Sequence, residues 1–440
     1  MYRLRSEFAP LALCLTFALA AAQQPPEAVA PPPLSLDQAT HEAIANNLDL
    51  AAERLNISVA EASEITARLR PNPVLTVAGQ TLNLLGAAYN PNTPLGPNQL
   101  NLHTDFPFER GHKREERIAL AREEKTLAEL GVREIMRQVV FGVQTAFVDV
   151  QEARERLNLA MENLRSLEGV VAVNEARFRS GDLAQVELER SRVAALQYRT
   201  AVQQAQLQVD QAKTRLQLLI GRKQTTPGFE VQSEIRRDEV ATTESEIAKL
   251  ALARRPDLLL SQRTQARSQA DLRLQLANGV TDYTIGAEYT RQSAWGVSGS
   301  SVGVYFSVPL RVYNRNQGEI ARAQREIALA KARSEATVVS IQSEVQRAWR
   351  QYTVSKELLA SVERGMLAKA KSVRDTTEYS YRRGEASLVE FLDAQRAFND
   401  VMQTFHEAQV NYARSLYLMD AVSGASVDSA AGTAQKGINQ

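Results

Sequence analysis

Apolar residues follow a helical period along much of this 440-residue chain. In two long segments they recur in alternating steps of four and three residues, a 3.5-residue spacing that is typical of coiled-coil helices. The first seam comprises Val132, Met136, Val139, Val143, Ala146, Val150, Ala153, Leu157, Ala160, Leu164, Leu167 and Val171, and the second comprises Val338, Ile341, Val345, Ala348, Tyr352, Ser355, Leu359, Val362 and Met366. A helix from about 112 to 175 would span about 96 Å at 1.5 Å per residue. We therefore expect long rods and not a compact domain.

Four shorter segments alternate apolar and polar residues, as half-buried strands do. Tyr283 to Thr290 and Val302 to Val308 flank a Ser/Gly-rich loop, and residues 75–77 and 100–106 flank a turn-rich loop around Asn90 to Pro94. Strands of about 10 residues are long enough to cross a bilayer when tilted. Beyond residue 22 no apolar run of about 18 residues occurs, so any membrane crossing must use strands.

The two halves of the chain repeat each other at a separation of about 200 residues. Residues 143–147 match 345–349, and 178–182 match 381–385. We predict a helix of roughly 30 residues at the start of each half, at 37–69 and 244–276. The predicted organisation is a signal peptide at 1–22, a Pro-rich tether at 23–36, a first repeat at 37–221, an equatorial connector at 222–243, a second repeat at 244–424 and a disordered tail at 425–440.

The predicted signal peptide begins with Arg3 and Arg5, continues with the apolar run Leu11 to Leu19, and ends near Ala22. Its removal would leave no cysteine, because Cys14 is the only one in the chain. Packing alone would then hold the exported chain together. Acylation at Cys14 is the less favoured alternative, since Leu13 precedes it where a small residue is expected.

Composition narrows the classes of function. Lys plus Arg number 52 against 51 Asp plus Glu, so no strong positive field would attract nucleic acid. No catalytic triad, phosphate-binding loop or paired carboxylate pocket is recognisable, and we expect neither an enzyme nor a cofactor. The histidines lack ligand spacing and the six methionines are scattered, so we expect no metal site; the histidines are His41, His103, His112 and His406.

Strands and rods together constrain the assembly. Four strands cannot close a barrel, and open edges cannot face lipid. Two copies would give eight strands with a filled interior, whereas three would give twelve strands and a lumen. The predicted fold is thus mainly α with a small β part: duplicated long-helix hairpins forming a trimeric helical barrel, capped by a 12-strand transmembrane β-barrel with four strands per chain.

The chain resembles the TolC-like outer-membrane efflux proteins from about Leu34 to Gly424. The likeness rests on the duplicated halves, on a repeated aromatic-x-x-Gly turn, and on the exits from the second and fourth strands, residues 106–114 and 308–318. Residues 308–318 look like the form found in the cobalt-zinc-cadmium exporter branch. The resemblance implies an outer-membrane exit duct that extends into the periplasm, with an inner-membrane RND pump, a periplasmic adaptor, outer-membrane lipid and two further copies of the chain as partners.

The resemblance also assigns roles to two groups of residues. The adaptor would contact the helical turns at Arg179, Ser180, Gly181, Asp182, Arg382, Arg383, Gly384, Glu385 and Ser387. Glu390 and Asp393 share one helix face and would line a periplasmic aperture as acidic rings that favour cations. Plain hairpin turns and a solvated acidic face are the alternatives. Ala386 stands where relatives carry a gate arginine, and Arg382 or Arg383 is the expected substitute.

Two questions stay open at the level of sequence. Within the duct class, the strand-exit motif favours heavy-metal cations over drugs or secreted proteins as cargo. From a different class, a periplasmic structural coiled coil without a pore explains the helices but not the four alternating segments.

Overall fold

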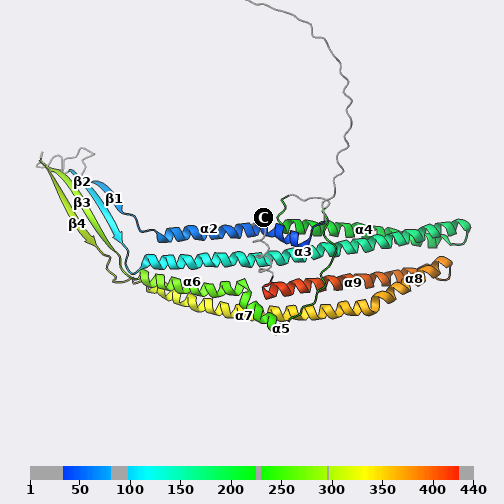
Figure 1. Cartoon of the computed structure of the whole chain (residues 1–440). Coiled ribbons are helices and arrows are strands. Elements are labelled where there is room, and N and C mark those ends of the chain that lie inside the picture. Colours follow the sequence, from blue (N-terminus) through cyan, green and yellow to red (C-terminus); the bar gives the residue numbers. More distant parts are fainter. Residues whose placement is uncertain (1–32, 81–97, 224–228, 295–296, 426–440) are drawn as a thin grey trace, which may run out of the picture.

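The computed structural model describes residues 33–80, 98–223, 229–294 and 297–425. The predicted signal peptide, residues 23–32 of the tether, the loop around Asn90 to Pro94 and residues 426–440 of the tail lie outside the described residues. The chain is long and narrow, with a small sheet at one end and helices running from it to two turns at the other end (Figure 1).

The described elements form two matching series. The first contains α1 (Leu36–Asn46), α2 (Leu48–Arg68), β1 (Val74–Gln80), β2 (Asn98–Phe108), α3 (Lys113–Ser180) and α4 (Gln185–Leu219). The second contains α5 (Glu244–Arg254), α6 (Pro256–Asn278), β3 (Tyr283–Ala294), β4 (Val297–Ser307), α7 (Gln317–Ser361), a π-helical turn η1 (Val362–Met366), α8 (Leu367–Arg383) and α9 (Leu388–Ser423). The order of elements is therefore the same in both series except for η1.

The single opening helix predicted for each half is wrong in both cases, because each is two helices. Asn47 ends α1 and begins α2 with an extended backbone (ψ 127°), and its side chain accepts a hydrogen bond from the Leu50 N–H at 3.0 Å. Arg255 has the same role between α5 and α6 (ψ 125°), because the proline that follows it disfavours the helical conformation. The buried Arg255 guanidinium is held by Asp257 and Glu344, each at 2.7 Å.

The four predicted strands are confirmed as one antiparallel sheet in the order β1-β2-β3-β4. The register pairs Leu102 with Tyr289, and Tyr289 with Val302, so one face of the sheet is apolar. The opposite face carries polar residues, including His103 and Asp105 of β2. β1 and β4 form the two edges of the described sheet.

α3 is a continuous helix of 68 residues, which confirms the predicted rod. Its seam is buried or half-buried from Val132 to Ala153, as expected. Farther along, the seam positions stay half-buried or buried, and the buried line also takes in Leu159, Asn163 and Asn174, which the seam did not include. The physical reason is tertiary: the buried line faces the second series, with which Asn163 and Asn174 form hydrogen bonds.

The second seam is buried from Ile341 to Val362, but Met366 is 46% exposed, contrary to the prediction. η1 adds one residue to the turn that follows Val362, so the inward position passes from Met366 to Leu367. The seam then continues along α8 to the buried Tyr381. A π-turn thus preserves the packing face across a one-residue insertion.

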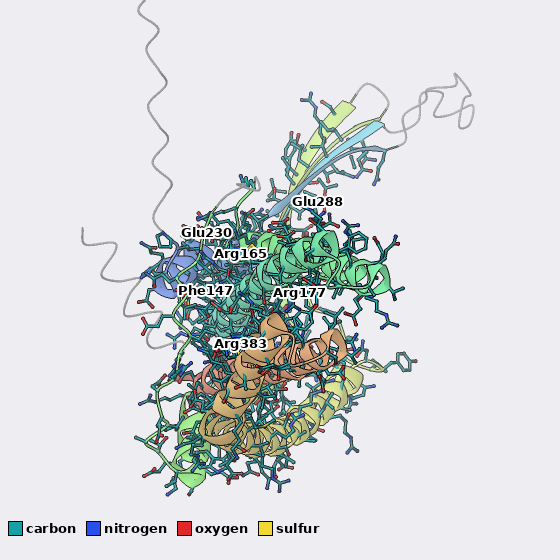
Figure 2. The ribbon with its side chains drawn as sticks, turned by 90° about the vertical axis from the view of Figure 1, so that its right-hand side faces the viewer. Phe147, Arg165, Arg177, Glu230, Glu288 and Arg383 are labelled. Carbon is teal, nitrogen blue, oxygen red and sulfur yellow. The ribbon has the colours of Figure 1, made fainter. Side chains whose placement is uncertain are left out.

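Residues 229–243 lead into α5 across the middle of the rods (Figure 1). Val231 pairs with Leu34 as a parallel bridge and packs in the same core cluster as Phe147 of α3. Glu230 in this segment forms ion pairs with Arg154 at 2.7 Å and Lys213 at 3.1 Å. Figure 2 shows Glu230 and Phe147 on the same side of the bundle.

Candidate functional site: the paired helical turns

The turns that end α3 and α8 have the same geometry. Gly181 (φ 85°) and Gly384 (φ 82°) are left-handed, a conformation that glycine adopts at little cost. The N–H of Asp182 donates to the Arg177 carbonyl at 2.8 Å, and the N–H of Glu385 donates to the Ser380 carbonyl at 2.9 Å. The repeated sequence thus encodes two identical helix stops at the end of the molecule opposite the sheet (Figure 1).

The structure brings all of the predicted adaptor-contact residues to this end and exposes them. Most of their interactions are local: Ser180 donates to Asp182 at 2.9 Å, Arg382 pairs with Glu378 at 2.6 Å, and Arg383 lies 4.4 Å from the Tyr379 ring centroid. The exposed set is Arg179, Ser180, Gly181, Asp182, Arg382, Arg383, Gly384, Glu385 and Ser387. Their backbones are fixed by the helix stops while their side chains face solvent.

An arginine that the sequence did not single out joins the two turns. Arg177 of α3 donates to the carbonyl of Arg382 at 2.9 Å and to that of Tyr381 at 3.3 Å. Within the described chain neither the Arg382 nor the Arg383 side chain bridges the hairpins. The view from this end shows Arg177 and Arg383 on the two neighbouring hairpins (Figure 2). The only sequence signal was a difference between the repeats, since Ser380 occupies the position equivalent to Arg177.

Tyr381 anchors the core beneath the turns. Its hydroxyl donates to Asn174 Oδ1 at 2.7 Å, and its ring stacks on Phe391 at a centroid distance of 5.6 Å. Burial raises the pKa of Tyr381 above its usual value, so the phenol stays protonated and remains a donor. Deeper in the bundle Gln395 donates to Asn163 at 2.9 Å. Buried polar pairs of this kind fix the register between helices.

The two predicted gate acids lie at the start of α9. Glu390 and Asp393 are both exposed and three residues apart. Glu390 accepts from the Ser387 N–H at 2.7 Å while Ser387 Oγ accepts from the Glu390 N–H at 3.2 Å, a reciprocal cap. These bonds lower the pKa of Glu390 below its ordinary value. Asp393 lies 3.5 Å from Arg396. Both acids therefore present charge at the surface, and Glu390 also stabilises the helix end.

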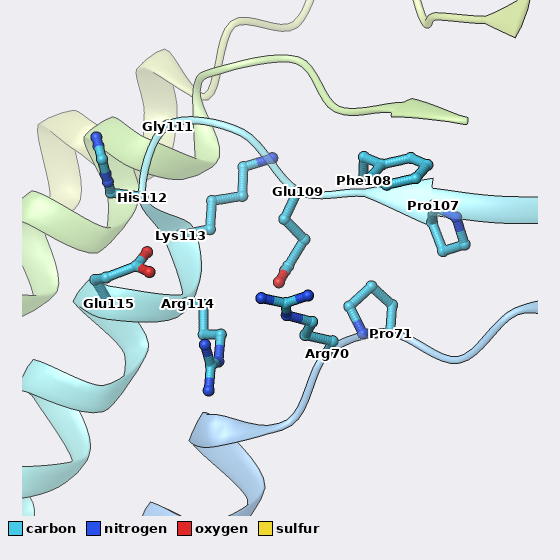
Figure 3. Close-up of a pocket in the computed structure, with 10 residues that line it drawn as sticks. All are labelled: Arg70, Pro71, Pro107, Phe108, Glu109, Gly111, His112, Lys113, Arg114 and Glu115. Atoms are coloured by element: carbon cyan, nitrogen blue, oxygen red, sulfur yellow. The ribbon is translucent and has the colours of Figure 1, made fainter. Parts of the chain in front are cut away.

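The exits from β2 and β4 share an unusual backbone. His112 and Asn316, each preceding a helix, are the positive-φ residues other than glycine in the described chain. The Asn316 side chain does not cap α7, and its amide donates to the Gln275 carbonyl at 2.7 Å. At the first exit, Lys113 pairs with Asp282 at 2.7 Å. A cavity of about 440 Å³ opens beside this exit, with Glu109 and Arg70 at its wall (Figure 3).

The remaining polar cluster lies on the sheet and consists of neighbouring side chains. His103 lies 3.0 Å from Asp105 and stacks on Tyr305, whose hydroxyl donates to Asp105. Gly286 leaves the space for that ring, which any side chain there would overlap. Across the residues that the structure describes, no three His, Cys, Asp or Glu side chains gather into a metal-binding group. None of the described helices has the length and apolarity needed to cross a membrane.

Comparison with known proteins connects this architecture to a family. The family model "Outer membrane efflux protein" matches residues 39–222 and 247–425. The cobalt-zinc-cadmium resistance protein CzcC of Cupriavidus metallidurans is 24% identical over 86% of each chain. The pyoverdine export outer membrane protein OpmQ of Pseudomonas putida is 25% identical over 60% of this chain and 57% of its own. A crystal structure of CusC superposes with a TM-score of 0.72 at 19% identity, covering 88% of this chain and 92% of that one.

Proposed function

Because the chain belongs to the outer membrane efflux protein family, we propose that it is the exit duct of a tripartite efflux system. Members of this family are channels of the outer membrane and not enzymes. One observation carries the proposal: α3 leads from the end of β2 through 68 residues to an exposed turn, a span of about 100 Å. A single chain thus links the sheet to a contact surface far from it.

The duct is a homotrimer in this proposal. β1 and β4 are edge strands in the described sheet, and an unpaired edge is not tolerated in lipid. Pairing β1 of one copy with β4 of the next, around three copies, closes a 12-strand barrel with a lumen. The helices of the three copies then continue the conduit into the periplasm. This proposal replaces the alternative from a different class, in which the protein is a periplasmic coiled coil without a pore.

The paired turns are the proposed docking site for a periplasmic adaptor, which connects the duct to an inner-membrane RND pump. Their backbones are held by the two glycine stops and by Arg177, so the exposed side chains are presented on a rigid frame. Glu390 and Asp393, repeated in three copies, would form acidic rings at the aperture.

The proposed cargo is a heavy-metal cation. The support is the match to CzcC over 86% of both chains, together with the exit motif at 308–318. The shorter match to a pyoverdine export protein supports a second candidate, an organic cargo. In this proposal the pump and the adaptor select the cargo, and the duct conducts it.

Deletion of the gene tests both the proposed duct and its proposed cargo. Cells are challenged with cobalt, zinc, cadmium, nickel, copper, and a panel of dyes and antibiotics. Sensitivity confined to metals is the expected result, whereas sensitivity to dyes alone would keep the duct and overturn the cargo.

Complementation tests the docking site. Asp182→Arg with Glu385→Arg reverses the charge that follows each glycine, and should reach the outer membrane at the normal level without restoring resistance. Arg347→Glu, a single charge reversal at an exposed position of α7, is the control for charge reversal away from the turns and should restore it. Full resistance with the double variant would place the adaptor contact elsewhere.

A further inference from the structure

The exit from β4 is an exposed segment in which both arginines and the tyrosine have side chains without partners. Between Ser307 and α7, Leu310 is 82% exposed and Tyr313 is 90% exposed. Across the described structure, no hydrogen bond or ion pair engages the side chains of Arg311, Tyr313 or Arg315. Large apolar side chains interleaved with unpaired arginines indicate a surface that is covered in the working molecule.

The equivalent exit of the first series is not bare. There Glu109 pairs with Arg117 at 2.5 Å and Lys113 pairs with Asp282 at 2.7 Å. Asp282 also accepts from the Arg110 N–H at 2.9 Å. The two exits begin from related sequences, so the missing partners are a property of the second exit and not of the motif.

An aromatic cluster places the membrane boundary next to this segment. On the apolar face of the sheet, Phe108 stacks on Tyr283 with centroids 5.2 Å apart, and Phe306 lies 5.6 Å from Tyr283. These three residues occupy the helix-proximal ends of β2, β3 and β4. Aromatic side chains on the apolar face of outer-membrane strands gather at the level of the headgroups. The exposed segment starts two residues after Phe306.

The apolar alternation of β4 also continues past the strand. Val302, Val304 and Phe306 are followed by Val308, Leu310 and Val312, all of them exposed, so exposed apolar side chains continue beyond the end of the strand. Arg311 and Arg315 interrupt this alternation, and no acidic residue lies between 308 and 316. Apolar side chains beside cations suit the zone where acyl chains meet phosphate groups.

We infer that the segment Val308–Arg315 lies in the headgroup layer of the leaflet nearest the helices, where Arg311 and Arg315 bind phospholipid phosphates. Leu310 and Val312 then reach toward the acyl chains, and Tyr313 spans the boundary. The inference rests on the outer-membrane location and not on the proposed cargo or partners. Positive charge without a compensating acid fits a phosphate layer better than the surface of a second copy.

Lipid titration tests the phosphate contacts. The full-length channel in detergent is titrated with phosphatidylglycerol, and bound lipid is counted by native mass spectrometry. Arg311→Gln with Arg315→Gln should weaken binding about fivefold for each arginine removed. The control, Arg325→Gln with Arg333→Gln, removes two exposed arginines of α7 and should bind as the parent does. Equal binding by both double variants would overturn the inference.

A depth measurement keeps the test independent of charge. Tyr313→Cys in a Cys14→Ser background is labelled with a fluorophore and reconstituted into vesicles containing nitroxide lipids. Quenching by a nitroxide near the headgroup, and less by one deep in the chain, is expected. No quenching, with cross-linking of the introduced thiol to a neighbouring copy, would make this surface a protein interface. Neither assay uses cargo, so a failure here is distinguishable from a failure of the proposed function.

Discussion

His406 is a titratable residue of α9 that is buried inside the bundle. It is 8% exposed, and its Nδ1 atom has no partner. Burial lowers its pKa below the ordinary value of 6.5, although Glu155 of α3 opposes the shift and the nearby Arg156 adds to it. Neutral imidazole is therefore the form that fits between α9 and α3.

The folded chain should lose stability through this residue as the pH falls. Because the folded pKa lies below 6.5, the unfolded chain takes up the proton first, and the stabilisation present above 6.5 is lost below it. The thermal midpoint of the purified channel, followed by circular dichroism, should fall from neutral to mildly acidic pH. His406→Gln cannot titrate and should flatten that dependence. An equal slope in the two proteins would show that other groups control it.

The N-termini of α4 and α9 differ by one cap. Ser387 forms the reciprocal cap with Glu390, whereas Ala184, its counterpart in the first series, provides no side-chain cap to α4. Glu187 already stands three residues after Ala184, so a serine there would complete the same motif.

Exchanging these caps should lower the local stability at the start of α9 and raise it at the start of α4. Ser387→Ala should cost about 1 kcal/mol locally and speed amide hydrogen exchange in the first turn of α9 by about fivefold. Ala184→Ser should slow exchange at the start of α4. The α9 cap should persist at mildly acidic pH, because the bonds from Ser387 lower the pKa of Glu390, and it should be lost only when the pH falls through that lowered value. Unchanged exchange in both variants would mean that packing alone holds these turns.

The elements differ in how well the sequence alone predicts them. Strands and rods followed from periodicity, because the strands alternate apolar and polar residues and the rods carry an apolar seam. The break at Arg255 had a visible signal in Pro256, but the break at Asn47 depended on one side-chain hydrogen bond. Met366 was misplaced because the 3.5-residue pattern was extended without a break, although the offset between the two halves grows from 202 residues at Val143 and Val345 to 203 at Phe178 and Tyr381. Arg177 was missed because its partners are backbone carbonyls, which no sequence pattern identifies.

At the scale of the whole molecule, the two turns matter as part of an assembly. In one copy, Glu390 and Asp393 are separate exposed acids, and only symmetry would concentrate them into a ring. Glutamine can replace glutamate in the cap, so charge can be removed at 390 without unfolding the turn.

Glu390→Gln with Asp393→Asn should weaken block of the channel by multivalent cations. We expect the blocking concentration in planar-bilayer recordings to rise roughly tenfold, which corresponds to about 1.4 kcal/mol. Glu187→Gln with Glu189→Gln removes the same charge from α4, at the same end of the molecule, and should leave the block unchanged. If multivalent cations block the α9 variant at the same concentration as the parent, these acids lie outside the constriction.

The π-turn at Val362–Met366 sets the second hairpin apart from the first. One extra residue rotates whatever follows it by about 100° and advances it by about 1.5 Å. η1 takes up that rotation within its own five residues, so the buried faces on both sides still point inward. The Gly384 turn thus follows a helix that contains a π-turn, whereas the Gly181 turn ends the uninterrupted helix α3. The one residue that the second series has in excess between Val345 and Tyr381 is therefore absorbed within η1, ahead of the Gly384 turn.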